Sequence, residues 1–441
     1  MAYTFRGGIH AAEHKNTAHT RVTELPPPRE VRILLSQHIG APCRPLVAVG
    51  DEVLRGQMIG DVTGGLGCPV HSSVSGRVKA IVPMRNAMGA AVEAVVIEND
   101  GQGRNDPSIT YSNRNLAETS PEEIIEIVRR AGISGMGGAS FPTYAKISSA
   151  IGRVDTMIIN AAECEPFITA NNRLINEHPE AVVSGARVLL HALGLKQGLI
   201  AIEDNKPHSI AILSGLTAES DDLRVCVMKT KYPQGDERQL IFALTGRELP
   251  PGKLPADVGC VVFNAETASS VYRAFNSNMP LIERIVTVDG DCVREPRNLM
   301  VPIGTPIREL IDFCGGLTKT PKTVINGGPM MGFAQWDIDA PVTKGTSAIL
   351  VFSEAMKHTS DPDAECIRCG RCVRGCPMHL MPVYLAAYAR RGMFEDARRV
   401  GAMNCVECGS CSYVCPAGVP IVQYIRVAKN ALRAAQATQK K

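Results

Sequence analysis

Two runs of closely spaced cysteines near the C-terminus constrain this 441-residue chain more than any other feature. The first run is Cys366-x2-Cys369-x2-Cys372-x3-Cys376-Pro377, and the same spacing recurs as Cys405-x2-Cys408-x2-Cys411-x3-Cys415-Pro416. Three thiolates spaced in this way can hold one corner of an iron–sulfur cube, and in two-cluster domains the fourth cysteine, followed by proline, ligates the other cluster. The pattern predicts two [4Fe-4S] clusters, one held by Cys366, Cys369, Cys372 and Cys415 and the other by Cys405, Cys408, Cys411 and Cys376.

Structural zinc and disulfide bonds are the alternatives for so many cysteines. Zinc sites typically use pairs of Cys-x2-Cys knuckles rather than two complete runs of this kind. Disulfide frameworks belong to small secreted domains, and this chain is large. Between the runs, residues 382–391 and 394–400 have helical patterns. We therefore expect a helical two-cluster ferredoxin domain that conducts single electrons.

The composition is that of an ordinary globular protein. Apolar residues make up 45% of the chain and charged residues 21%, which is too apolar for disorder. Lys plus Arg number 47 against 44 Asp plus Glu, so bulk charge gives no reason to expect nucleic acid or an anionic membrane. No stretch approaches the roughly 18 apolar residues of a membrane span, and residues 1–25 lack a signal-peptide core. We expect a protein on the cytoplasmic side whose membrane association comes through partners.

Residues 29 to about 100 combine short strand patterns with turns rich in Gly and Val. Val47–Gly60 and Pro69–Ile81 resemble the two hairpin halves of a biotinyl/lipoyl-type barrel sandwich. Those domains carry a prosthetic group on a lysine at a hairpin tip, whereas the matching turn here, Ser72-Ser73-Val74, has no lysine. We expect a scaffold barrel without a swinging arm.

An alternation of strand and helix patterns occupies residues 115–275. Ser120-Pro-Glu-Glu123 has the form of a capping box with Pro at the first helical position, which predicts a helix start. Alternation of this kind predicts a parallel sheet with helices on its faces. The predicted strands are 154–159, 199–202, 223–227 and 260–263, and helix-compatible stretches include 179–193 and 237–244.

A glycine-rich segment, Gly132–Lys146, lies between two helical patterns in this region. It does not follow a strand, so it fails the context of a dinucleotide-binding fingerprint. Glycines nevertheless allow close backbone approach to a phosphate or a flat ring, and Lys146 can neutralise a phosphate, although a plain turn is the alternative. Ligands bind beyond the carboxyl ends of strands in open α/β sheets, so polar residues at several strand ends favour a composite cleft. These residues are Asn160, Glu163, Glu165, Glu203, Asp204, Lys229 and Asn264.

Residues 281–335 resemble a soluble-ligand-binding β-grasp (SLBB) domain, for which a connecting role is favoured over ligand binding. A strand-like run at 346–352 follows, and its parent sheet cannot be assigned from the sequence. The fold class expected is therefore multidomain α/β and α+β. Its units are an N-terminal arm (1–28), a barrel-sandwich domain (29–104), an α/β domain (105–280), an SLBB domain (281–335), a connector strand (336–357) and the two-cluster ferredoxin domain (358–441).

Four motifs occur in the order seen in the flavin-bearing, NADH-oxidising subunit of respiratory complex I. They are Gly135–Lys146, Asn160–Pro166, Tyr232–Glu237 and Asn264–Thr267. Over essentially its full length the chain resembles the RnfC family more closely, the NADH-binding subunits of Rnf ferredoxin:NAD oxidoreductases. The opening Phe5–His10, the barrel, the SLBB unit and the paired cysteine runs all fit this resemblance.

The resemblance implies FMN and NAD(H) as cofactors beside the two clusters. FMN would lie against Gly135, Gly137, Gly138 and Ala139, with Lys146, Asn160, Asn264 and Thr267 on its phosphate and ribityl chain. Glu163 and Glu165 would position the nicotinamide, Phe141 would stack on a dinucleotide ring, and Tyr232, Gly235, Asp236 and Glu237 would complete the site. The chain departs from the complex I pattern at Ala162, where that subunit has Asp, and at Asp236, where it has Glu.

Together these modules answer one chemical problem. NADH gives two electrons as hydride, iron–sulfur clusters take one at a time, and a flavin converts between the two. The resemblance implies a peripheral subunit of a membrane-associated, ion-translocating complex with RnfA, RnfB, RnfD, RnfE and RnfG, and with ferredoxin as an indirect partner. The alternative is a soluble NADH-dependent donor, such as a microcompartment cobalamin reductase or an amino-acid reductase partner. A third hypothesis is a non-catalytic adaptor protein, which would bind no flavin.

Overall fold

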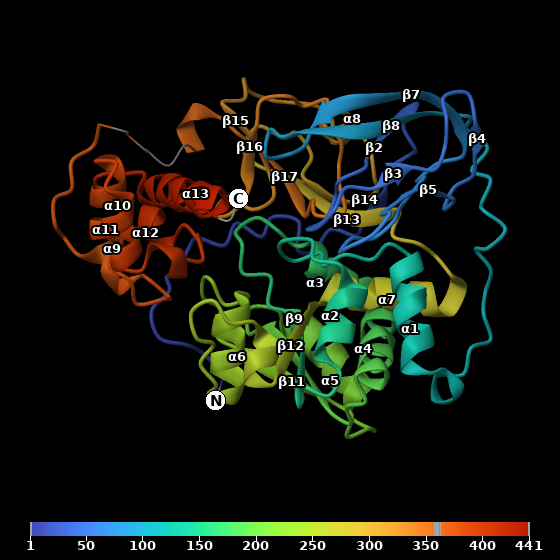
Figure 1. The fold of residues 1–441 in the computed structure, drawn as a ribbon, viewed down its shortest axis with the longest axis horizontal. Helices are drawn as coiled ribbons and strands as arrows, with labels where there is room; N and C mark the ends of the chain where they lie inside the picture. The colour runs from blue at the N-terminus through green and yellow to red at the C-terminus, as the bar shows by residue number, and fades with distance from the viewer. Residues whose placement is uncertain (1, 357–360, 362, 440–441) are drawn as a thin grey trace.

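Four structural units follow one another along the chain, and the N-terminal segment runs between them (Figure 1). The computed structural model describes residues 2–356, 361 and 363–439. An antiparallel barrel and a second β-rich unit lie above an α/β domain in this view, and a helical domain with the cysteine runs lies to one side. Within the described residues, no helix is both long and apolar enough to cross a bilayer.

The α/β domain is built on a four-stranded parallel sheet in the order β11-β10-β9-β12. The strands coincide with the four predicted apolar runs, so the predicted parallel sheet is confirmed. They are β9 (Thr156–Ala161), β10 (Gly198–Glu203), β11 (Leu223–Met228) and β12 (Cys260–Asn264). The helices are α1 (Pro121–Arg130), α2 (Thr143–Ala150), α3 (Ala170–Glu177), α4 (Pro179–Leu193), α5 (Pro207–Thr217), α6 (Glu237–Thr245) and α7 (Ala265–Ser277).

Both faces of this sheet are covered, which explains why its strands read as continuous apolar runs. Ile159 and Phe263 belong to the core shared with α4 and α7, whereas their neighbours Ile158 and Val262 pack with α6 on the opposite face. Helices α4 and α7 approach closely at Gly185, where a Cβ atom would collide with the Ala268 carbonyl. Helix α1 begins as predicted, because the Ser120 side chain accepts a hydrogen bond from the Glu123 N–H (3.2 Å).

The predicted barrel sandwich consists of two antiparallel sheets, β2-β8-β7-β4 and β3-β5-β6. The turn that matches a lipoyl attachment point is buried, and the Ser73 hydroxyl donates to the Ile303 carbonyl of the neighbouring unit. A buried tip agrees with a scaffold role. The strands are β2 (Glu30–Leu34), β3 (Arg44–Pro45), β4 (Glu52–Val53), β5 (Met58–Asp61), β6 (Val70–His71), β7 (Gly76–Arg85) and β8 (Ala91–Asn99).

The SLBB unit is centred on a six-stranded sheet, and its composition corrects one prediction. The run assigned to a connector at 336–357 forms β17 (Ala348–Phe352), which pairs with β13 and β15 in the middle of the sheet. β17 pairs with β13 in parallel, and the two strands are far apart in sequence. No local sequence pattern can therefore predict this pairing. The other elements are β1 (Thr23–Glu24), β13 (Glu283–Asp289), β14 (Arg297–Pro302), β15 (Thr323–Asn326), β16 (Phe333–Gln335) and α8 (Ile307–Phe313).

The cysteine domain is helical, as the sequence predicts. Each run opens into a short helix and is followed by a longer one, which gives the domain an internal repeat. The elements are α9 (Arg371–Arg374), α10 (Pro382–Arg390), α11 (Phe394–Arg399), α12 (Ser410–Tyr413) and α13 (Ile421–Gln439).

The N-terminal arm is bound along its length rather than free. Tyr3 bridges to Met228 beside the parallel sheet, Ile9 bridges to Tyr232, and β1 joins the SLBB sheet through β14. Gly7 lies against the backbone of Cys376, where a Cβ atom would meet the carbonyl. The arm therefore connects the α/β, cysteine and SLBB units.

Candidate functional site

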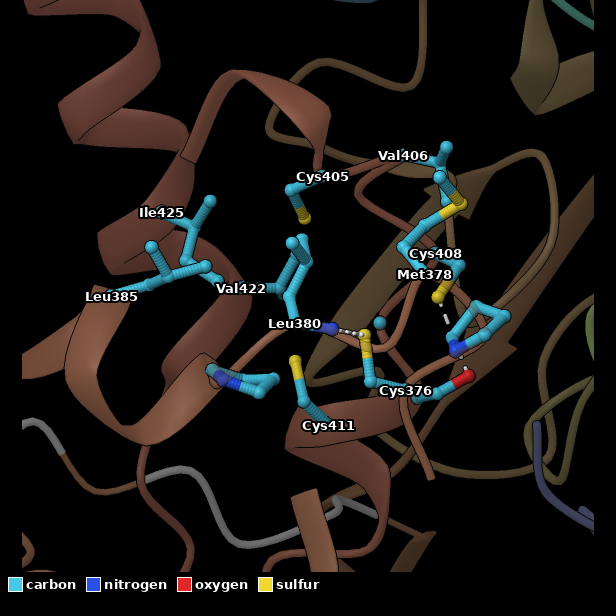
Figure 2. A pocket seen from close by; sticks show the side chains of 14 residues that line it. Cys376, Met378, Leu380, Leu385, Cys405, Val406, Cys408, Cys411, Val422 and Ile425 are labelled. Atoms are coloured by element: carbon cyan, nitrogen blue, oxygen red, sulfur yellow. Dashed lines mark hydrogen bonds between the residues drawn. The ribbon is translucent and has the colours of Figure 1, made fainter. Parts of the chain in front are cut away.

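Four of the cluster cysteines line one pocket (Figure 2). Cys376 comes from the first run, and Cys405, Cys408 and Cys411 come from the second. Leu380, Leu385, Val422 and Ile425 supply an apolar wall. We call this group the buried cysteine site, and it is the same set that the sequence predicts for the second cluster.

The remaining four cysteines form what we call the exposed cysteine site: Cys366, Cys369, Cys372 and Cys415. Cys366 and Cys369 are exposed, whereas Cys372 is buried. Burial raises the pKa of the Cys372 thiol, and the neighbouring Cys366 and Cys415 thiolates add to that rise. Residues from both runs thus meet here too, in the crossed arrangement predicted from the spacing.

The two runs share the same local backbone. Arg368 and Glu407 occupy equivalent positions in the left-handed region, with φ of 58° and 57°. The turn lets their N–H groups donate to the sulfurs of Cys366 (3.4 Å) and Cys405 (3.3 Å). Hydrogen bonds to cluster sulfurs are a normal part of iron–sulfur sites, so the loops fit the group that the spacing predicts.

Among the described residues, no group of three or more His, Cys, Asp or Glu side chains converges on one metal position. In the buried cysteine site the thiols instead lie around a pocket with apolar walls. Thiolates around such a pocket suit a multi-iron cluster better than a zinc knuckle.

The residues predicted to hold a flavin lie around the carboxyl end of the parallel sheet, where β9 and β12 end in Asn160-Ala161 and Asn264. Gly137 lies against Asn264, where a Cβ atom would come within 2.7 Å of Nδ2, and a Cβ atom at Gly138 would meet nothing within 4 Å. The Thr267 hydroxyl accepts a hydrogen bond from the Met136 N–H (3.1 Å) and ties the loop to α7. Ala139 is exposed. The loop therefore presents open backbone, as a surface for a flat ring or a phosphate requires.

Lys146 lies on α2 and reaches β12, whereas Asn160 lies near the carboxyl end of β9. Lys146 Nζ donates to the Val262 carbonyl (3.0 Å) and lies 4.0 Å from Glu237 Oε2. Asn160 Nδ2 donates to the Gly235 carbonyl (2.8 Å), which joins β9 to the loop before α6. The structure thus brings the Gly135–Ala139 loop, Lys146, Asn160, Asn264 and Thr267 to one edge of the sheet.

The two glutamates expected on the nicotinamide side both have protein partners. The Glu163 carboxylate accepts from the Asn171 (2.6 Å) and Asn172 (3.2 Å) N–H groups at the start of α3. The Glu165 carboxylate accepts from the Met330 and Met331 N–H groups of the SLBB unit (3.1 and 3.0 Å). Burial raises the pKa of Glu165 to about 7. These side chains hold their loop to its surroundings.

Three further predicted residues act through contacts that the sequence does not show. Asp236 caps α6 by accepting from the Arg238 and Gln239 N–H groups (3.1 and 3.2 Å). The carbonyl of Phe141 accepts from the Gly135 N–H (2.9 Å) and closes the glycine loop. Tyr232 is buried, and its hydroxyl donates to the Cys408 carbonyl (2.7 Å). The sequence places Tyr232 with the flavin, and the structure turns its hydroxyl toward the buried cysteine site.

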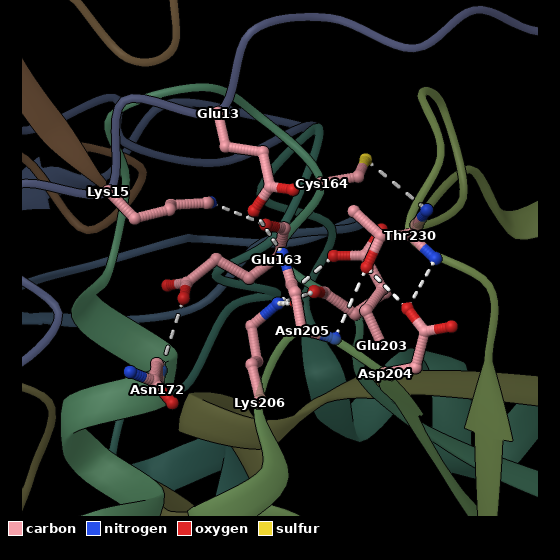
Figure 3. A network of polar contacts seen from close by, with 12 residues as sticks. Glu13, Lys15, Glu163, Cys164, Asn172, Glu203, Asp204, Asn205, Lys206 and Thr230 are labelled. Carbon is pink, nitrogen blue, oxygen red and sulfur yellow. Dashed lines mark hydrogen bonds and ion pairs between the residues drawn. The ribbon is translucent and has the colours of Figure 1, made fainter.

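A polar network lies beneath the 162–168 loop (Figure 3). Lys206 Nζ donates to the Ala162 carbonyl (2.7 Å) and pairs with the buried Glu203 (3.0 Å). From the N-terminal arm, Lys15 Nζ donates to three carbonyls of the same loop. Sequence reasoning missed both lysines, because neither lies in a motif and Lys15 is far from the loop in sequence.

Comparison with known families matches each unit separately. A model described as the Nuo51 FMN-binding domain matches residues 128–273, and an RnfC barrel sandwich hybrid domain matches 3–102. An SLBB domain matches 285–334, and a 4Fe-4S dicluster domain matches 365–419. These units define a class of protein, the flavin- and iron–sulfur-dependent oxidoreductase subunits that exchange electrons with NAD(H).

Curated relatives narrow the class to one family. The chain is 43% identical over 97% of its length to the C subunit of the Na(+)-translocating ferredoxin:NAD(+) oxidoreductase complex of Acetobacterium woodii, covering 96% of that protein. It is 42% identical over its full length to the proton-translocating counterpart of Clostridium ljungdahlii, again covering 96%. It is also 42% identical over 98% to the equivalent protein of the ion-translocating oxidoreductase complex of Rhodobacter capsulatus, covering 84%. The chain belongs to the RnfC family.

Membership of this family confirms the predicted function and cofactors. The chain is an oxidoreductase subunit that moves electrons between NAD(H), FMN and two [4Fe-4S] clusters, as one subunit of a larger complex. The matches favour this function over the soluble donor, and the FMN-binding domain argues against the adaptor. Among solved structures, an NAD+-reducing [NiFe]-hydrogenase shares the fold at 17% identity and a TM-score of 0.50, covering 74% of this chain and 68% of its own.

Proposed function

We propose that electrons pass between the flavin cleft and the buried cysteine site first, and between the two cysteine sites second. One observation carries this order. The buried Tyr232 belongs to the segment that lines the cleft, and its hydroxyl donates to the Cys408 carbonyl at 2.7 Å. Tyr232, Cys408 and Cys164 share one apolar cluster, so the cleft and the buried site are in direct contact.

FMN would be held by the Gly135–Ala139 loop, with Lys146, Asn160, Asn264 and Thr267 toward its phosphate and ribityl chain. Phe141 and Gly235–Glu237 would bind NAD(H). Bound FMN would supply the conversion between a two-electron hydride and single electrons. Glu163 and Glu165 serve the NAD(H) side by fixing the shape of their loop, because both carboxylates already accept backbone N–H groups. No protein nucleophile is needed.

The exposed cysteine site is the point at which electrons enter or leave the subunit. Residues 366–369 are all exposed, whereas the equivalent Val406 and Cys408 of the second run pack against Tyr232 and Met330. Among the described residues, the repeat therefore leaves one copy of the same loop exposed and the other packed against other units. Arg368, Arg371 and Arg374 surround it and are exposed, which suits a redox partner with an acidic surface.

In the intact complex that partner belongs to the Rnf set, which comprises RnfA, RnfB, RnfD, RnfE and RnfG, with ferredoxin as an indirect donor. The relatives are named as ferredoxin:NAD(+) oxidoreductase subunits, which supports electron flow from ferredoxin to NAD+ through this chain. We place the chain peripherally, on the cytoplasmic side of the membrane, where NAD(H) and ferredoxin are available.

The order of transfer is tested by mixing the fully reduced, cluster-reconstituted chain anaerobically with NAD+. Absorbance follows NADH formation, and rapid-freeze EPR follows each cluster. In the wild-type protein both clusters become oxidised. In Cys408→Ser, which removes a ligand of the buried site, the exposed cluster should stay reduced although NADH still forms from the flavin. In Cys369→Ser the buried cluster should be oxidised normally. Rapid oxidation of the exposed cluster in Cys408→Ser would refute the proposed order.

A further inference from the structure

The N-terminal arm follows the loop that joins β9 to α3 (Figure 3). The Glu13 carbonyl accepts from the Phe167 N–H (2.9 Å), and the His14 ring stacks on Phe167 with centroids 4.7 Å apart. Lys15 points into the loop from the same stretch. Residues 13–15 thus contact the loop by backbone, ring and charge, although they lie far from it in sequence.

The Lys15 ammonium group is fully used by the loop. Its Nζ donates to the carbonyls of Glu163 (2.8 Å), Glu165 (2.8 Å) and Ile168 (2.7 Å). A lysine ammonium has three N–H donors and no acceptor, so three carbonyls at these distances saturate it. These bonds gather carbonyls from both ends of the loop around one positive charge.

The backbone of the 163–168 loop is strained at two residues, and Lys15 is placed to hold it in that conformation. Glu163 and Phe167 both adopt left-handed conformations, with φ of 55° and 69°, that side-chain-bearing residues rarely take. Conformations of this kind persist only where the surroundings enforce them, and they concentrate at functional sites. Lys15 is placed to enforce both, since its acceptors span residues 163 to 168.

We infer that Lys15 is a positioning residue for NAD(H). Its ammonium draws the carbonyls of the 163–168 loop together and thereby fixes the nicotinamide side of the cleft. This inference rests on the proposed function, in which that loop lines the NAD(H) site. It assigns a role to the N-terminal arm, which the sequence motifs leave without one.

The test uses full-length, flavin- and cluster-reconstituted protein and measures NAD+ affinity by calorimetry. Lys15→Ala removes the ammonium and leaves a cavity open to a small cation. We expect NAD+ binding to weaken about tenfold, because displacing a positioning element by an ångström has effects of this order or larger. Methylammonium, which carries the same three N–H donors, should restore most of the affinity. Amide hydrogen exchange across residues 163–172 should rise in the variant and fall again with methylammonium.

Two controls separate the brace from general effects. Lys231→Met removes another lysine that links the arm to the α/β domain, through the Phe5 carbonyl (2.9 Å), and should leave NAD+ affinity unchanged. Tetramethylammonium has no N–H donors and should not rescue Lys15→Ala. The inference is overturned if Lys15→Ala binds NAD+ like the wild type, or if tetramethylammonium rescues as well as methylammonium. Failure of the wild-type protein to bind NAD+ would instead overturn the proposed function.

Discussion

The two cysteine runs have the same local backbone and opposite surroundings. Arg368 and Glu407 occupy equivalent positions and both adopt the left-handed conformation. Gly370 and Gly409, two residues further on, do the same, with φ of 71° and 80°. Gly409 is buried beneath the Met330 carbonyl, whereas a Cβ atom at Gly370 would meet only the tip of Arg374. The spacing of the cysteines fixes the loop, and the rest of the chain decides which copy is enclosed.

This difference gives an otherwise symmetrical pair of sites a direction. The second run contacts three other units: Ile9 and Ala12 of the arm, Tyr232 of the α/β domain and Met330 of the SLBB unit. The first run has the equivalent surface open to solvent. A repeat that is enclosed at one end and open at the other is suited to passing electrons between an internal cofactor and an external partner.

The same substitution in the two runs should produce the largest difference. Gly409→Ala adds a Cβ atom 2.8 Å from the Met330 carbonyl in a left-handed backbone, and we expect a loss of about 3 kcal/mol in unfolding free energy. Gly370→Ala has the backbone strain without the collision and should lose about 1 kcal/mol. Chemical denaturation of both holoproteins measures the difference. Equal losses would show that the packing around Gly409 does not matter.

Much of this arrangement could be predicted from local patterns. The crossed cysteine sets follow from spacing, the parallel strands from four apolar runs, and the glycine loop from its position before α2. Each depends on residues that are neighbours in sequence or that repeat with a fixed period. These features can be predicted because the residues that form each of them lie close together in the sequence.

Contacts between distant segments could not be predicted. The central place of β17 depends on pairing with β13 and β15, and the brace from Lys15 depends on a loop more than a hundred residues away. Glu163 and Glu165 stand out in the sequence as acidic residues near a cleft, yet their carboxylates are engaged by the start of α3 and by the SLBB unit. The acidic residues therefore identify the region of the site, but the sequence does not show which groups their carboxylates contact.

Removing the Tyr232 hydroxyl should have a smaller effect, and of the two clusters only the buried one should respond. Tyr232→Phe leaves the buried Cys408 carbonyl without its donor and removes a longer contact to Glu165 (3.4 Å), and we expect a loss of about 1 kcal/mol in unfolding free energy. A redox titration followed by EPR should show the midpoint potential of the buried cluster shifted and that of the exposed cluster unchanged. Tyr384→Phe, on the exposed face of α10, is the matched control and should change neither. Equal shifts in both clusters would remove the distinction between the two sites.

The smallest effect is expected from exchanging the charge that distinguishes the two loops. Arg368→Glu gives the first run the side chain that its counterpart carries at Glu407 in the same left-handed turn, so folding and NADH-driven flavin reduction should be unaffected. Electron transfer with an acidic partner should be about fivefold slower than in the wild type at low salt, and the difference should disappear at high salt, because exposed charges mainly steer association and salt screens them. Lys196→Glu makes an equal change of net charge in the turn between α4 and β10 and should have no such effect. If both variants slow transfer equally, net charge rather than the surface around the exposed cysteine site governs docking.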